Sequence, residues 1–345
     1  MTKILVVFTG GTIGSRIEGA TINVDDAMSR VIIEGFTKEY PDIDVIFDTV
    51  QPMNVLSENF TPAHWKIISD CVAEKSSDNY DGVIITHGSD TIPYTSAYMG
   101  FLFSQSNIPI VLTCSNHVLG HPNSNGQDNF NNSVLLIAKN HIKGVFSVFQ
   151  DKKKRNVVYL ATRMQEANPY DDQFTTFGNI EFGQVIDGTF VLNENPQNPK
   201  KEELAEKEGK KIVCKNQSEF TNQILAIKAY PGLNYNNFTL TNKTKAVLCA
   251  LYHSSSNCVE NAEFSLTEFI SKCNSKGVDV YLMSFKRIGG EVYLTTKRIM
   301  DAGGIPLLNI SFESAYVKLV LAYNQNEIDP KKYMQNEIYY ENLVI

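Results

Sequence analysis

Short apolar runs separated by amphipathic stretches recur along the first 150 residues. Runs such as Ile4–Phe8 and Gly82–Thr86 are continuously apolar, which is typical of parallel strands buried on both faces. One intervening stretch carries Trp65, Ile68 and Val72 at positions i, i+3 and i+7, the spacing of an amphipathic helix. Strands that alternate with helices of about 10–15 residues predict a parallel sheet with right-handed crossovers.

This pattern predicts the element order and two domains. We expect strands at residues 4–8, 44–47, 82–86, 108–113 and 144–149, and helices at residues 25–40, 61 onward, 92–105 and 125–139. Residues 193–211 are almost devoid of apolar side chains, which is typical of a solvated linker. The alternation resumes from Ile224. We therefore predict an α/β fold with a larger, mostly parallel N-terminal domain (residues 1–192), a linker (193–212) and a smaller C-terminal α/β domain (213–345).

Composition narrows the classes of partner. The 345 residues carry a net charge of −7, which argues against nucleic acid or an anionic membrane surface as a partner. No apolar run approaches the roughly 20 residues of a membrane helix, and the first eight residues read as a strand rather than a leader. Six scattered cysteines without a C-x-x-C motif favour a reduced, cytoplasmic environment.

Two hydroxyl-rich loops are the strongest candidates for chemistry. Thr9–Ser15 and Thr86–Thr91 each follow a predicted buried strand, so both lie at the carboxyl edge of one sheet, where open α/β folds bind ligands. The first loop is no dinucleotide fingerprint, because Thr9 stands where that motif needs glycine, and it is no P-loop, because no lysine precedes Ser15. An ordinary strand-to-helix turn with incidental threonines remains an alternative.

A family resemblance adds to this interpretation. The two loops resemble those of the bacterial-type L-asparaginase family, and most of all those of its cytoplasmic type I branch. Further similar segments extend over nearly the whole chain: 57–62, 108–115, 124–127, 230–232 and 301–304, followed by Glu313. The resemblance implies the two-domain asparaginase fold, hydrolysis of L-asparagine to aspartate and ammonia, no metal or organic cofactor, and a homodimer or homotetramer.

The resemblance also implies roles for individual residues. Thr12 corresponds to the threonine that attacks the substrate's side-chain amide, while Ser89 and Asp90 correspond to two members of a proton-transfer set. Asp90 would also pair with the substrate's α-amino group, and Ser57 would hold its α-carboxylate. The substrate-binding positions implied in this way are Ser57, Glu58, Gly88 and Ser115. An unactivated hydroxyl is a weak nucleophile, so such a site also needs a base and oxyanion donors.

The gravest departure from the family pattern is at the proton-transfer lysine, where this chain has Glu166. Losing a positioned proton-transfer group typically costs about 10²–10⁴-fold in rate. If Glu166 lay about 5 Å from Asp90, their repulsion at an effective dielectric constant of about 20 would be roughly 3 kcal/mol and would raise one carboxyl's pKa. Three interpretations stay open: Glu166 is itself a general base, Glu166 points away and leaves a slow or differently specific amidohydrolase, or the protein is a silent relative that binds an amino acid or a protein.

Milder departures also fall near the site. Ser89 replaces a usual threonine, Cys114 a glycine and Asn125 an aspartate, and no tyrosine occurs in the stretch 19–22 where the family's flexible loop has one. Two other clusters are weak candidates. His117 and His121 lack the glutamate of a zinc motif and favour a loop, and residues 152–155, although basic, favour a solvated hairpin over an RNA-binding patch.

Overall fold

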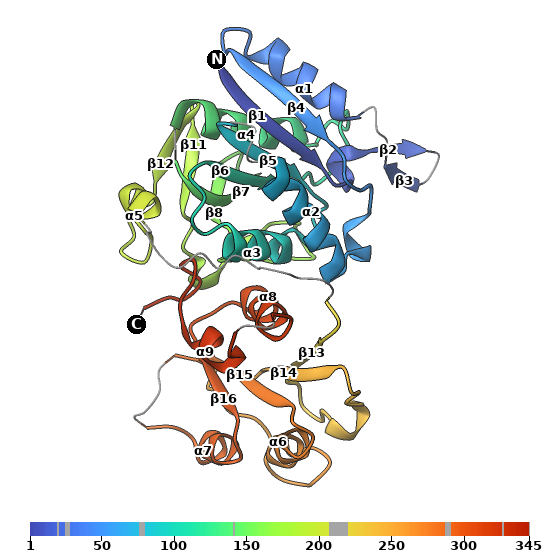
Figure 1. The fold of residues 1–345 in the computed structure, drawn as a ribbon, viewed down its shortest axis with the longest axis vertical. Coiled ribbons are helices and arrows are strands. Elements are labelled where there is room, and N and C mark those ends of the chain that lie inside the picture. Colours follow the sequence, from blue (N-terminus) through green and yellow to red (C-terminus); the bar gives the residue numbers. More distant parts are fainter. Residues whose placement is uncertain are drawn as a thin grey trace. The chain divides into compact units, whose positions relative to one another are not determined.

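The computed structural model describes residues 1–18, 21–24, 28–75, 80–140, 142–206, 220–286, 291–325 and 328–344 (Figure 1). The chain forms two compact units, Met1–Val213 and Cys214–Ile345. Each unit contains its own parallel sheet with helices packed on it. None of the helices in the described ranges is long and apolar enough to cross a membrane.

An eight-stranded sheet forms the centre of the first unit, as far as the described residues show. Its strand order is β12-β11-β8-β7-β6-β5-β1-β4. The bounds are β1 Thr2–Phe8, β4 Val45–Val50, β5 Gly82–Thr86, β6 Pro109–Thr113, β7 Gly144–Gln150, β8 Asn156–Leu160, β11 Gly183–Ile186 and β12 Thr189–Leu192. The strands from β4 to β7 across the sheet are parallel, which confirms the prediction from their continuous apolar runs.

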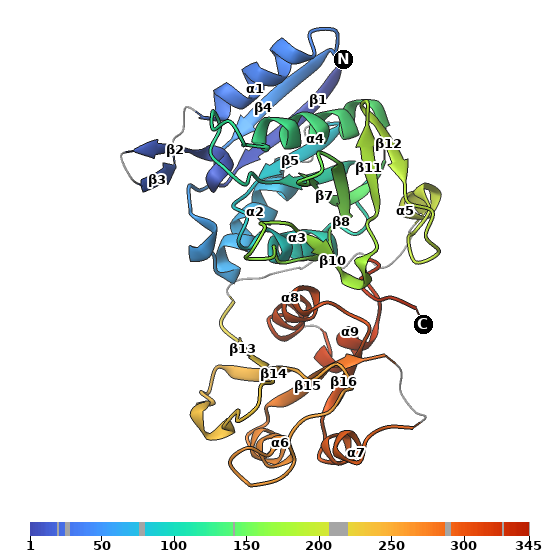
Figure 2. The ribbon, with the colours of Figure 1, turned by 180° about the vertical axis from the view of Figure 1, so that it is seen from behind.

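Helices cover both faces of this sheet (Figures 1 and 2). α1 (Met28–Glu39) and α4 (Gly126–Asn140) contact each other, and α4 packs on the sheet on that side. α2 (Pro62–Lys75) and α3 (Ile92–Leu102) also contact each other and pack on the sheet. α3 is apolar around most of its circumference, because nine of its residues are buried. The helix predicted over 25–40 begins at Met28 in the structure, and residues 25–27 lie outside the described residues.

The connections place a topological switch point between β1 and β5. From β1 the chain runs through α1 to β4 at the edge of the sheet, and then through α2 to β5 on the other side of β1. β1 is followed by α1, whereas β5 is followed by α3, which lies with α2. Ligands of open α/β sheets bind at such points, beyond the carboxyl ends of the strands. Both hydroxyl-rich loops start there.

Beyond β7 the sheet becomes antiparallel, which the sequence pattern did not predict. β8 runs antiparallel to β7, β11 to β8, and β12 to β11. The basic residues 152–155 lie in the β7–β8 turn, as the hairpin interpretation predicted, and Arg155 forms ion pairs with Asp151 and Glu181. Two small hairpins complete the unit: β2 (Ser15–Glu18) with β3 (Thr21–Val24), and β9 (Met164–Gln165) with β10 (Thr175–Thr176).

The start of the predicted linker is attached to the first unit. Asn198 Nδ2 donates to the Glu181 carbonyl at 2.9 Å, and Arg163, which is buried, donates to the Gln197 carbonyl at 2.7 Å. The short helix α5 (Lys201–Glu206) follows. Asparagine side chains can bond backbone groups in place of a ladder or a core, so a polar segment can be ordered without apolar residues. The rest of the predicted linker, from residue 207, lies outside the described residues.

The second unit is a parallel sheet in the order β13-β14-β15-β16. The strands are β13 Gln223–Lys228, β14 Thr244–Ala250, β15 Asp279–Phe285 and β16 Ile305–Leu308, and the helices are α6 Leu266–Asn274, α7 Leu294–Asp301, α8 Phe312–Tyr323 and α9 Pro330–Gln335. α6 packs on β15 and α8 on β13 and β14. The two smaller-domain strands predicted at 246–251 and 278–283 therefore occur as β14 and β15.

A buried ion pair holds the last residues of the second unit against α8. Lys318 Nζ lies 2.5 Å from Glu341 Oε1, and both side chains are almost fully buried. Glu341 also accepts hydrogen bonds from the backbone amides of Ile338 and Tyr339, at 3.0 and 2.7 Å. A buried charge needs this kind of complete pairing, because desolvation would otherwise cost several kcal/mol.

Candidate functional site

The first loop turns sharply at the end of β1. Gly10 and Gly11 both have positive φ values, 104° and 76°, which favour glycine. The Gly14 amide then donates to the Gly11 carbonyl at 3.0 Å, and this turn forms the 3₁₀ helix η1 (Thr12–Gly14). Thr12 is therefore the first residue of η1, directly at the carboxyl edge of the sheet, and it is half-buried.

The two hydroxyl-rich loops are in direct backbone contact. A Cβ atom added to Gly11 would lie 2.5 Å from Gly88 Cα and closer still to the Gly88 nitrogen. The contact is supported one step earlier in each loop, where Thr9 Oγ1 donates to the Thr86 carbonyl at 2.8 Å. Only glycine permits such an approach at Gly11, so the glycines bring Thr12 and Ser89 to the same corner of the sheet.

Ser57 joins this corner from a third segment. A Cβ atom added to Gly88 would lie 2.5 Å from Ser57 Cβ, so the serine side chain packs directly on the second loop. Thr91 Oγ1 donates to the Ser57 carbonyl at 2.9 Å, and the Val55 amide donates to the Thr9 carbonyl at 3.0 Å. Ser57 begins the 3₁₀ helix η2 (Ser57–Asn59) and is buried. The structure therefore brings three of the predicted site segments together.

His87 supports the second loop from below. Its ring is fully buried, with Nδ1 2.9 Å from the Gly88 carbonyl oxygen and Nε2 2.9 Å from Thr95 Oγ1. Burial lowers the pKa of His87 to about 4, partly offset by the bond to the Gly88 carbonyl. A neutral ring with both nitrogens bonded to protein groups is a scaffold for Gly88 and Ser89. Sequence reasoning did not single out this residue.

Asp90 has two carboxylates near it, and neither is Glu166. Asp90 is more exposed than its neighbours, yet desolvation by the surrounding protein raises its pKa, and the negative charges of Glu58 and Asp172 raise that pKa further. Glu58 lies on η2 and Asp172 on the turn between β9 and β10. The expected rise in the pKa of Asp90 is present. Its assignment to a like charge at residue 166 is wrong, because Glu166 is not among the charges that shift Asp90.

Glu166 is instead bonded to a tyrosine of α3. Tyr94 Oη donates to Glu166 Oε1 at 2.5 Å. Glu166 directly follows β9, and its side chain is exposed, whereas Tyr94 is half-buried. The position was found from the sequence, but the direction of the side chain was not. Tyr94 was missed because it lies in the first turn of a helix that reads as entirely apolar.

Ser115 lies on the loop that follows β6, next to the second loop. The His87 amide donates to the Thr113 carbonyl at 2.8 Å, which joins the two loops at the sheet edge. Ser115 Oγ donates to the His117 carbonyl and lies 3.1 Å from Ser124 Oγ. Its hydroxyl therefore orders its own loop. A role of Ser115 in substrate binding stays a prediction.

Two family departures have structural explanations. Asn125 Oδ1 accepts from the Asn116 amide at 3.0 Å, while Asn125 Nδ2 donates to the Gln150 carbonyl at 2.9 Å. An aspartate could make the first bond but not the second. Cys114 is fully buried, and burial raises the pKa of its thiol, so it is an inert apolar residue here.

The other candidates from the sequence add no ligand site. The rings of His117 and His121 lie 4.3 Å apart in a loop. Among the residues that the structure describes, no group of three metal-ligating side chains occurs. The stretch expected to replace the family's flexible-loop tyrosine includes Gly19 and Ala20, which lie outside the described residues, and nothing is described of the neighbouring side chains of β2 and β3.

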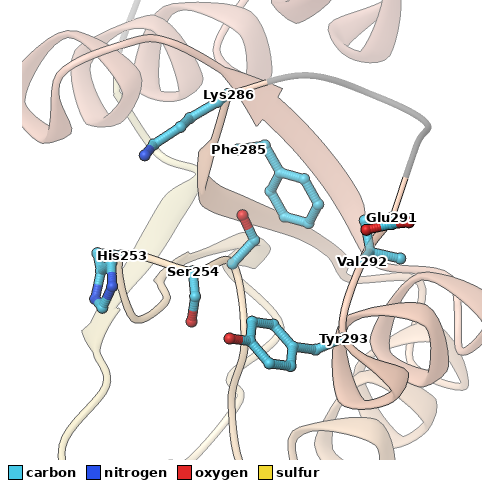
Figure 3. A pocket seen from close by; sticks show the side chains of 8 residues that line it. His253, Ser254, Phe285, Lys286, Glu291, Val292 and Tyr293 are labelled. Carbon is cyan, nitrogen blue, oxygen red and sulfur yellow. The ribbon is translucent and has the colours of Figure 1, made fainter.

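A separate pocket of about 200 Å³ lies in the second unit at the carboxyl ends of β14 and β15 (Figure 3). In this view His253 and Lys286 lie on one side, whereas Glu291 and Val292 lie on the other. Its lining also includes Ser254, Ser255, Phe285 and Tyr293. Sequence reasoning missed this pocket, because its walls come from three separate segments.

The fold and the first-unit site define an α/β protein whose hydroxyl-bearing loops meet at the switch point of a parallel sheet. Comparison with known proteins makes the class specific. Residues 3–198 match the family described as Asparaginase, N-terminal. The chain belongs to the asparaginase family.

Curated relatives that span nearly the whole chain carry another name. A component of the glutamyl-tRNA(Gln) amidotransferase from Sulfolobus acidocaldarius is 28% identical over 344 residues, covering 95% of this chain and 72% of that protein. The protein of the same name from Methanococcus vannielii is 26% identical over 346 residues, covering 96% and 77%. Membership of the type I branch in particular therefore stays a prediction.

Solved structures confirm the two-domain α/β fold. L-asparaginase I from Vibrio cholerae superimposes with a TM-score of 0.77 at 22% identity, covering 99% of both chains. The thermostable L-asparaginase from Thermococcus kodakarensis gives 0.77 at 22% identity, covering both chains completely. A probable cytoplasmic L-asparaginase from Campylobacter jejuni gives 0.73 at 21% identity, covering 99% of each chain.

Proposed function

We propose that this protein hydrolyses the side-chain amide of an amino acid, with L-asparagine as the first substrate to test. The contact of Gly11 with Gly88 carries the proposal, because it brings Thr12 and the Ser89–Asp90 pair to one corner of the sheet, beside Ser57. Family membership supports the same reaction class.

In the proposed reaction Thr12 Oγ attacks the amide carbonyl carbon, and its proton passes to a base of the site. The C–N bond breaks, ammonia leaves with a proton, and an ester links the acyl group to Thr12. Water then cleaves the ester and releases the acid. Asp90 is the proposed base on the Ser89 side, since its raised pKa brings a carboxylate closer to the pH at which it works. Ser57, Glu58, Gly88 and Ser115 are the proposed substrate-binding residues.

The test is ammonia release from asparagine by the purified protein, compared with Thr12→Ala and Thr12→Ser. Turnover that is absent in the alanine variant and partly kept in the serine variant supports a hydroxyl nucleophile. Wild-type turnover no higher than that of Thr12→Ala would overturn the proposal. That result would favour the alternative of a silent protein that binds an amino acid or a protein partner.

The relatives favour a second candidate function. Two of them are named as components of an amidotransferase that acts on glutamyl-tRNA(Gln). In this case the same site would release ammonia for a coupled acceptor rather than for catabolism. Ammonia release that appears only when a partner protein and an aminoacylated tRNA are added would identify it, and glutamine and asparagine should be compared in both assays. The expected homodimer or homotetramer, the cytoplasmic location and the absence of nucleic-acid partners stay predictions.

A further inference from the structure

The exchange of the family lysine for Glu166 leaves a question that the site alone does not answer: what the glutamate does. Its carboxylate accepts a 2.5 Å hydrogen bond from Tyr94 Oη. A hydrogen bond to an ionised carboxylate is roughly twice as strong as a neutral one. The bond joins the residue after β9 to the first turn of α3, one helical turn beyond Asp90.

β9 and β10 form a hairpin whose outer turn carries Asp172. Met164 pairs with Thr176 and Gln165 with Thr175, and the Asn168 amide donates to the Gln173 carbonyl at 3.0 Å, which closes the turn. β9 packs on α3, and β10 lies beside that helix in Figure 2. We name residues 164–176 the β9–β10 hairpin.

Two hydrogen-bonded anchors hold this hairpin from different sides. The Lys152 amide donates to Gln173 Oε1 at 2.7 Å, and Lys152 Nζ lies 2.5 Å from Asp171 Oδ2, so the β7–β8 turn fixes one side. The bond from Tyr94 to Glu166 fixes the side that faces α3. With both anchors in place, the charge of Asp172 acts on Asp90.

We propose that Tyr94 and Glu166 form a positioning pair, which holds the β9–β10 hairpin against α3 and thereby keeps Asp172 beside Asp90. The role deepens the proposed amide hydrolysis and rests on it. Glu166 is then neither the base of the reaction nor a substitute for the missing lysine. It acts through Tyr94 and the hairpin, and the carboxylates that face Asp90 are Glu58 from η2 and Asp172 from the hairpin.

The variants separate these roles. Tyr94→Phe removes the hydroxyl and releases the hairpin, whereas Glu166→Gln removes the charge but keeps an oxygen that can accept from Tyr94. Asp172→Asn removes the charge that the hairpin carries. Tyr98→Phe is the matched control: it removes a hydroxyl one turn further along α3, where Tyr98 Oη lies 3.2 Å from Ser69 Oγ, away from the hairpin.

The primary measurement is a carboxyl ¹³C NMR titration of Asp90 in protein labelled at the aspartate side chains, with Asp90→Asn to assign the signal. We expect Tyr94→Phe and Asp172→Asn each to move the Asp90 titration to lower pH by about 0.5 unit, the scale of a partly exposed like-charge pair. The double variant should move it no further than Asp172→Asn alone. Glu166→Gln and Tyr98→Phe should leave it in place.

An Asp90 titration that is unchanged in Tyr94→Phe would overturn the proposal, as would a shift in that variant without one in Asp172→Asn. The titration requires no turnover, so the positioning role and the proposed function can fail separately. Where turnover is measured, the acid limb of kcat/KM should move with the NMR titration. Loss of turnover in Glu166→Gln with full turnover in Tyr94→Phe would instead identify Glu166 as the base.

Discussion

Replacing Gly11 by alanine tests the contact on which the site depends. An alanine there would keep φ at +76°, which costs about 1–2 kcal/mol for a residue with a Cβ atom. Its Cβ would also lie 2.5 Å from Gly88 Cα, and the neighbour is backbone, which cannot rotate away. Overpacking of this kind typically costs about 1–3 kcal/mol. We therefore expect Gly11→Ala to lower the free energy of unfolding by about 2–5 kcal/mol.

Gly120→Ala is the matched control for backbone strain. Gly120 has φ +89° in the same unit, and an added Cβ would meet no atom within 4 Å. This variant should lose only the strain contribution of about 1–2 kcal/mol. The difference between the two variants therefore measures the clash between the loops.

Urea unfolding followed by tryptophan fluorescence suits this comparison. Trp65 is the single tryptophan of the chain; it lies on α2 in the first unit, is 4% exposed and stacks on Tyr98 at 5.4 Å between ring centroids. Its signal thus reports on the unit that contains both variants. Equal losses of stability in Gly11→Ala and Gly120→Ala would refute the contact and the shared site built on it.

Two further predictions concern buried charges. Because the pKa of His87 is about 4 in the folded protein and near 6.5 in an unfolded chain, the unfolded state takes up the proton first on acidification; stability should be complete above about pH 6.5 and fall by up to about 3 kcal/mol towards pH 4, and a urea midpoint that Trp65 fluorescence shows to be constant over this range would contradict it. Lys318→Met should lower the stability of the second unit by about 3–5 kcal/mol, because Glu341 is left buried without its cation, and Lys318→Met combined with Glu341→Leu should recover part of this loss in hydrogen exchange of β14 and β15.

The strands that position the site were predictable because their signal is local. A continuous run such as Gly82–Thr86, buried throughout, can hardly be anything but a central strand, and the loop that follows it inherits a place at the sheet edge. The reversal to antiparallel pairing at β8 was not predictable in this way. Strand direction depends on which distant residues pair, as when Phe146 faces Leu160, and no periodicity within a strand encodes it.

For the site, the sequence predicted positions better than directions. The glycines and hydroxyls at 11, 12, 88 and 89 follow from their loops, whereas the partner of Glu166 depends on how a two-residue strand packs on a helix. Tyr94 is chemically ordinary in a helix as apolar as α3. The charge that acts on Asp90 was likewise predicted in sign but not in origin, because Asp172 reaches it only through the turn of the β9–β10 hairpin.

The meeting of two glycines has a mechanical consequence. With backbone against backbone at Gly11 and Gly88, there is no side chain between the loops that could change rotamer and let one loop shift without the other. The loops bearing Thr12 and Ser89 therefore move as one rigid body with the strands that precede them. Catalytic groups fixed before the substrate arrives need no rearrangement during the reaction, which is where electrostatic catalysis gains most. In this protein that stiffness comes from two residues with no side chain at all.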